Sequence, residues 1–169
     1  VISSYSFDGT GQNMVTRVRD QFKLASRDPS VKAVLLKVDS PGGEVMASDE
    51  IHKIIEKFTK ETNPNRPVVC SMGGLAASGG YWLACAGDHV YADESSIIGS
   101  IGVIYSGFGF AEMLSKLGIE RRLHTVGDRK ALLDPFGPEK PADLVRLKVL
   151  QKEIHASFKQ LVRERRAGK

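Results

Sequence analysis

Hydrophobic residues recur every three or four positions in several segments of the chain, a pattern typical of amphipathic helices. The spacing predicts helices over residues 13–25 and 142–165, and a further helix that starts at Ser48 as its N-cap. A shorter run of small and apolar residues predicts a buried helix over residues 81–86. We expect each of these helices to turn an apolar face toward a common core.

Short runs of β-branched and other apolar residues lie between the helices, and turn-forming residues follow them. They predict strands over residues 31–38, 67–72, 89–92 and 122–126. Strands that alternate with helices form right-handed βαβ units and a mainly parallel sheet. The sequence therefore predicts an α/β fold, and its 169 residues fit one domain, residues 1–169.

Composition and charge narrow the class of protein. Hydrophobic residues make up 41% of the chain and charged residues 26%, as in ordinary globular domains. Much of the basic excess behind the net charge of +4 lies in residues 146–169, where a solvated helix face explains it. A basic patch with interleaved aromatic residues is absent from the sequence, so we expect no nucleic-acid partner. Cys70 and Cys85 lie in apolar contexts typical of small buried residues and predict no disulfide framework.

Two glycine-rich turns follow predicted strands, DSPGGE at residues 39–44 and GGLAASGGY at residues 73–81. Ligands of open α/β sheets bind beyond the carboxyl ends of the strands, where both turns are expected. Ser78 lies at a strand-to-helix corner among small residues, which is the geometry of a nucleophile elbow. The N–H of Gly79 could stabilise an oxyanion, with Gly43 or Gly42 as second donor. The alternative is that both turns are glycine-rich for backbone reasons alone.

A serine nucleophile needs a general base, and the residues leave more than one candidate. The chain has four histidines, and an order Ser78, Asp134, His155 could make a triad. Against this, Ala76 stands where the hydrolase elbow has glycine, and the chain is short for that fold. A lysine can replace histidine if burial and nearby positive charge keep it neutral. Lys130, in the loop GDRK that leaves a predicted strand, is the candidate lysine.

Four segments in order resemble the signal peptide peptidase A family, which includes protease IV and the SohB-like proteases. They are SPGG at residues 40–43, SMGGLAASGGYWLA at 71–84, GSIGVI at 99–104 and GDRK at 127–130. The resemblance extends over about residues 32–137 and implies a crotonase- or Clp-protease-like fold of ββα and βαβ units. The resemblance further implies that Ser78 is the nucleophile and Lys130 the general base. It also implies that Ser100 hydrogen-bonds the lysine and that the amides of Gly43 and Gly79 form the oxyanion hole.

The same resemblance implies a serine endopeptidase with a Ser–Lys dyad and without metal or cofactor. Its substrates would be cleaved signal peptides and membrane-associated fragments, degraded on the extracytoplasmic side. Family members carry an N-terminal membrane segment and assemble into rings, so we expect a homo-oligomer and a membrane-anchored longer protein. Arg129 departs from the aromatic residue that many members have before the lysine. Two alternatives stay open: a crotonase-type acyl-CoA enzyme and a catalytically inactive scaffold that binds peptides.

Overall fold

The computed structural model describes residues 1–5, 12–62 and 66–167. The chain forms two compact units, one made of Val1–Gly102 with Ser157–Lys169 and the other of Val103–Ala156. The glycine-rich turns and Ser78 belong to the first unit, and Lys130 belongs to the second.

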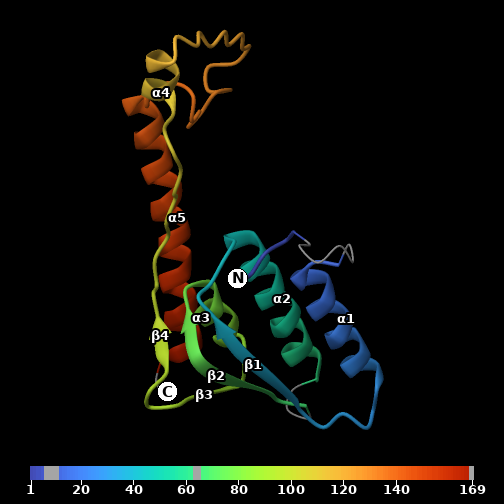
Figure 1. Ribbon diagram of the computed structural model, residues 1–169. Coiled ribbons are helices and arrows are strands. Elements are labelled where there is room, and N and C mark those ends of the chain that lie inside the picture. Colours follow the sequence, from blue (N-terminus) through green and yellow to red (C-terminus); the bar gives the residue numbers. More distant parts are fainter. Residues whose placement is uncertain (6–11, 63–65, 168–169) are drawn as a thin grey trace. The chain divides into compact units, whose positions relative to one another are not determined.

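A parallel sheet lies at the centre of the first unit (Figure 1). Its strands are β1 (Val34–Ser40), β2 (Val68–Ala77), β3 (His89–Ala92) and β4 (Ile97–Gly99). Strand β2 pairs with β1 from Val68 to Ala76, with a register shift before Ser40. The first half of β2 also pairs with β3, and its last three residues pair with β4. All three pairings are parallel, so the carboxyl ends of β1, β2 and β4 meet at one edge, as the predicted α/β fold requires.

Helices α1 (Met14–Arg27) and α2 (Val45–Thr62) lie side by side next to this sheet (Figure 1). They pack through Phe22 and Phe58, whose rings meet edge to face with centroids 5.2 Å apart. Asn13 begins α1, since its side chain accepts a hydrogen bond from the Thr16 N–H at 2.9 Å. The short helix α3 (Gly79–Ala84) follows β2 directly.

The long C-terminal helix α5 (Pro141–Arg166) contributes its last turns to the first unit. Phe158 is buried against Trp82 of α3, with ring centroids 4.7 Å apart. Arg165 donates hydrogen bonds to the carbonyl oxygens of Cys85 and Ala86 at 2.9 and 2.8 Å. These bonds satisfy carbonyl groups at the end of α3, which helix ends otherwise leave without partners.

The second unit contains α4 (Ala111–Lys116) and the first turns of α5. The Phe110 N–H donates to the Pro135 carbonyl at 2.6 Å, and Arg121 forms an ion pair with Asp134. None of the helices in the described part of the chain is long and apolar enough to cross a membrane.

Most of the predicted elements are confirmed, and the differences have physical causes. The segment 122–126 is not a strand, because no described strand pairs with it. Ser48 is not an N-cap: α2 begins three residues earlier, and the Ser48 hydroxyl donates to the Glu44 carbonyl at 2.8 Å. The strand predicted to end at Met72 continues to Ala77, because its glycine-rich half pairs with β4. Strand β4 and helix α4 were not predicted from the sequence.

Candidate functional site

Ser78 occupies the corner between β2 and α3, as its sequence context predicts. Its backbone has φ 51° and ψ −121°, a conformation that costs a non-glycine residue on the order of 1–3 kcal/mol. The side chain is half-buried at the start of α3. Such a strained strand-to-helix turn is the geometry that exposes a nucleophilic hydroxyl at the end of a sheet.

The glycines around Ser78 allow backbone segments to approach one another closely. A Cβ on Gly42 would lie 2.7 Å from the Ser78 Cβ and 3.0 Å from the Gly79 nitrogen. A Cβ on Gly79 would lie 2.3 Å from the Ser48 hydroxyl, and one on Gly80 would lie 2.8 Å from a backbone carbonyl of β1. The glycine-rich composition therefore reflects close packing of the turn after β1 against the corner after β2.

The N-terminal segment holds the first glycine-rich turn from its other side. The Ile2 N–H donates to the Gly42 carbonyl, and the Glu44 N–H donates to the Ile2 carbonyl, both at 2.9 Å. Successive amides of an extended chain point to opposite sides, so the Gly43 N–H points away from Ile2. A Cβ on Gly43 would lie 2.0 Å from the Ile2 carbonyl oxygen, which leaves room only for glycine.

Glu44 fixes this N-terminal segment in place. Its carboxylate accepts hydrogen bonds from the Ser3 hydroxyl at 2.9 Å and from the Ser4 N–H at 3.0 Å, and the Ser4 hydroxyl also donates to it. The bonds from Ser4, with that from Ser3, hold the pKa of Glu44 below its usual value. Ile2 and Glu44 were not predicted from sequence, because their contacts join segments about 40 residues apart. Those of Ile2 are made by its backbone and those of Glu44 with Ser3 and Ser4 by its carboxylate.

Ser100 lies at the carboxyl end of the strand adjacent to Ser78. Ala77 is paired with Gly99, and the Ser78 N–H donates to the Gly99 carbonyl at 2.8 Å. Ser100 also has a positive φ, 53°, and its side chain is exposed. The sheet therefore brings Ser78, Ser100 and both glycine-rich turns to one edge of the first unit.

Lys130 belongs to the second unit, in a turn that begins at Gly127. Gly127 has φ 106°, and the Lys130 N–H donates to its carbonyl at 3.3 Å. The lysine side chain and its neighbour Arg129 are exposed. Lys130 is thus the one predicted site residue that the sheet of the first unit does not carry.

Other candidate groups have structural roles. His52 is buried in α2 and its Nδ1 lies 3.0 Å from the Trp82 carbonyl oxygen; burial lowers its pKa. Asp134, the acid of the alternative triad, pairs with Arg121. Burial raises the pKa of Cys70 to about 12 and that of Cys85 to about 11, which keeps both thiols protonated and inert. Within residues 1–5, 12–62 and 66–167, no three His, Cys, Asp or Glu side chains are grouped as metal ligands.

A parallel α/β sheet with a serine at a strand-to-helix corner, faced by a second glycine-rich turn, defines the fold and site of a serine-hydrolase class of protein. Two family models match the chain: peptidase family S49 over residues 60–169 and Clp protease over residues 8–98. The chain belongs to peptidase family S49, and its fold is Clp-protease-like.

Two relatives with protease names agree with this assignment, and a third relative carries a different name. Protease 4 of Haemophilus influenzae is 38% identical over 112 residues, 66% of this chain and 17% of that protein. The chloroplastic serine protease SPPA of Arabidopsis thaliana is 34% identical over 148 residues, 88% of this chain and 21% of that protein. A Brucella melitensis protein named Na(+)/H(+) antiporter NhaA is 49% identical over 145 residues, 86% of this chain. The chain spans only 19% of that protein and about a fifth of the other two.

Proposed function

We propose that this chain is the catalytic part of a serine endopeptidase in which Ser78 is the nucleophile. The observation that carries the proposal is the strained conformation of Ser78 at the end of β2, with φ 51° and ψ −121°. A residue held in such a conformation, here with the Gly42 backbone packed against its Cβ, is typical of functional sites. Membership of a peptidase family favours amide hydrolysis over acyl-CoA chemistry at this corner.

In this mechanism Ser78 attacks the scissile carbonyl carbon and its proton passes to a neutral Lys130. The carbonyl oxygen becomes an oxyanion, which accepts hydrogen bonds from the N–H groups of Gly79 and Gly43. The Gly79 N–H lies at the start of α3, where backbone amides have no partner within the helix. Each oxyanion donor of this kind contributes about 3–4 kcal/mol to transition-state stabilisation.

Lys130 then gives the proton to the leaving amine, and an acyl-enzyme on Ser78 remains. Water attacks this ester, Lys130 takes the proton of the water and passes it to the Ser78 oxygen, and the acid product leaves. Ser100 orients the lysine amine through a hydrogen bond. This dyad requires the turn from Gly127 to Lys130 to present its amine to the edge of the sheet that carries Ser78.

The substrates that this proposal assigns are cleaved signal peptides and hydrophobic fragments of membrane proteins, degraded by a membrane-associated homo-oligomer. Extended peptides of this kind reach a serine at a sheet edge, whereas folded proteins do not. Assembly of several copies would further restrict the access of folded proteins to Ser78.

Labelling with a fluorophosphonate tests the proposal directly. We expect the unmodified chain to be labelled at Ser78, identified by mass spectrometry of the labelled peptide, and the Ser78→Ala variant to remain unlabelled. The same two proteins are then assayed with a fluorogenic signal-peptide substrate. Equal labelling of both proteins, or turnover of acyl-CoA in place of peptide, would reject the assignment.

A further inference from the structure

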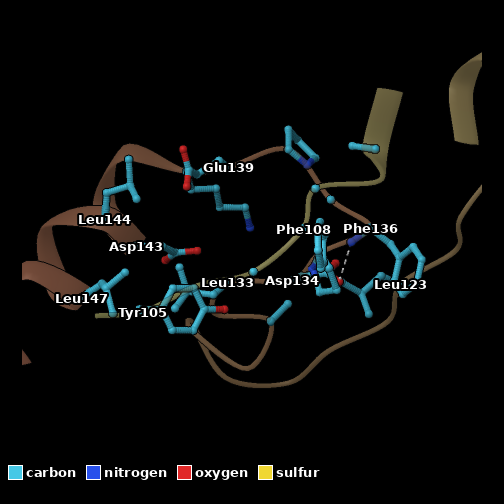
Figure 2. Close-up of a pocket in the computed structure, with 18 of the residues that line it drawn as sticks. Tyr105, Phe108, Leu123, Leu133, Asp134, Phe136, Glu139, Asp143, Leu144 and Leu147 are labelled. Atoms are coloured by element: carbon cyan, nitrogen blue, oxygen red, sulfur yellow. Dashed lines mark hydrogen bonds between the residues drawn. The ribbon is translucent and has the colours of Figure 1, made fainter. Parts of the chain in front are cut away.

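The second unit contains a pocket of about 860 Å³ that the proposed mechanism does not use. Figure 2 shows that aromatic and aliphatic side chains from the loop segments and from the start of α5 surround it. Its volume is within the range of sites that bind small ligands or single side chains, roughly 300–1,000 Å³. The main apolar side chains that line it are Tyr105, Phe108, Leu133, Phe136, Leu144 and Leu147.

Asp143 lines this pocket with a carboxylate that has no partner among the described residues. The residue is only 9% exposed, and its side chain points into the hollow (Figure 2). Within the described part of the chain, its carboxylate oxygens have neither a hydrogen-bond partner nor an ion-pair partner. A carboxylate that faces an apolar pocket without a counter-ion can accept charge-assisted hydrogen bonds from a cationic group.

Acidic side chains outnumber basic ones around this pocket. Four carboxylates and two cations line the pocket. Arg121 is already paired with Asp134 and lies over the Phe136 ring, 5.5 Å from its centroid. Glu112 pairs with Lys116 at 2.7 Å. The remaining charged groups are Glu139, Lys140 and Asp143, which together carry a net negative charge.

We propose that the pocket binds a basic side chain, lysine or arginine, of a peptide. Leu133, Leu144 and Leu147 would contact the aliphatic stem, and Asp143 would accept hydrogen bonds from the ammonium or guanidinium group. The aromatic rings add cation–π attraction, of which Arg121 over Phe136 is an internal example.

The assignment of this pocket as a substrate subsite rests on the proposed endopeptidase function. Ala131 and Leu133, which line it, follow Lys130 along the chain, so the pocket adjoins the turn that carries the proposed base. A basic residue beside an apolar stretch is the composition of a signal peptide, with its charged n-region and apolar h-region. The pocket would therefore select peptides with a lysine or arginine next to an apolar run.

Peptide binding to the Ser78→Ala variant tests this without requiring any hydrolysis. The ligands are three versions of one apolar peptide, with lysine, norleucine or acetyl-lysine at a single position, titrated by calorimetry. We expect the lysine peptide to bind about tenfold more tightly than the other two, as for a charged hydrogen bond. Since these ligands vary while the protein is unchanged, the comparison does not depend on the folding of a pocket variant.

Asp143→Asn in the same background should abolish the preference for lysine, whereas Glu120→Gln should keep it. Glu120 is an exposed acid of the same unit that lies outside the pocket, so it controls for the loss of one negative charge. Equal affinity for the three peptides would overturn the proposal, as would an Asp143→Asn protein that still prefers lysine. If Asp143→Asn instead weakens self-association in sedimentation and the peptides bind equally, the counter-ion comes from a second copy and the peptide site is rejected. Failure of the unmodified chain to hydrolyse peptides would count against the catalytic proposal alone.

Discussion

The corner that carries Ser78 and the turn that carries Lys130 are built in different ways. Ser78 is held by the sheet: its N–H donates to Gly99, and Gly42 packs against its Cβ position. Lys130 is held by a turn with a single 3.3 Å backbone bond to Gly127, and its side chain is exposed. One region is determined by pairing between strands and the other by local backbone conformation.

This difference affects how much backbone strain each region can hold and how easily each can move. The sheet can store the unfavourable backbone conformation of Ser78, because paired strands on either side prevent it from relaxing. A turn without strand partners stores little strain, but it can change conformation at low cost and present a lysine when substrate binds. In the proposed enzyme the nucleophile is thus preorganised and the base is positioned by a softer element.

The largest effect is expected from Ser78→Ala, which tests the preorganised corner after β2. Loss of the nucleophile should reduce peptide hydrolysis by at least about a thousandfold, and the fold should be kept, because only a hydroxyl is removed. Hydrolysis of a fluorogenic peptide and circular dichroism of the same sample check both parts.

Ser78→Gly is the control for strain at the same position. Glycine tolerates a positive φ, so the free energy of unfolding should rise by about 1 kcal/mol while hydrolysis is lost. A Ser78→Gly protein that is no more stable than Ser78→Ala would show that the conformation is not strained.

Lys130→Arg and Lys130→Met test the softer side and should reduce hydrolysis by about a hundredfold or more, because neither side chain can accept the serine proton. Their melting temperatures should equal that of the unmodified chain, since the side chain is exposed. Hydrolysis by the unmodified chain should fall in acid, because a protonated base cannot accept the serine proton. An active Lys130→Arg enzyme, or a pH profile abolished by His155→Ala, would transfer the role of base to a histidine.

The two regions also differ in how far the sequence predicts them. The corner at Ser78 is predicted from local patterns, because a strand-forming run, small residues and a helical run follow one another there. The strand predicted at 122–126 does not form, because a strand needs a partner and alternating residues do not provide one. The support of Gly43 by Ile2 depends on backbone contacts over about 40 residues, which carry no side-chain signal. The role of Lys130 was indicated by resemblance, and composition alone would not single it out among the lysines.

Gly42→Ala and Gly127→Ala compare the two regions through one substitution. Both glycines have nearly the same φ, 109° and 106°, so both substitutions should cost about 1–2 kcal/mol in backbone strain. Only at Gly42 does the added Cβ also meet backbone and the Ser78 Cβ, at 2.7–3.1 Å, whereas nothing lies within 4 Å at Gly127. Urea denaturation should therefore show a further loss of about 1–3 kcal/mol for Gly42→Ala. Equal losses would show that packing around Ser78 is looser than the contacts indicate.

The smallest effect is expected from acid, which should lower the stability of the first unit through His52. The ring is buried, and its Nδ1 donates to the Trp82 carbonyl of α3, the helix that starts after Ser78. Burial lowers the pKa of His52 in the folded protein below the 6.5 of the unfolded chain. The unfolded chain therefore binds a proton first, so this contribution to stability is complete above pH 6.5 and decreases as the pH falls through the folded value. Urea denaturation at several pH values below neutrality should show this decrease.

The variant His52→Asn keeps a donor near the position of Nδ1 but does not titrate, so it should flatten the acid side of the curve of stability against pH. His124→Asn, at an exposed position of the second unit, should leave the curve unchanged. A curve that His52→Asn does not alter would mean that other groups of the first unit cause its sensitivity to acid.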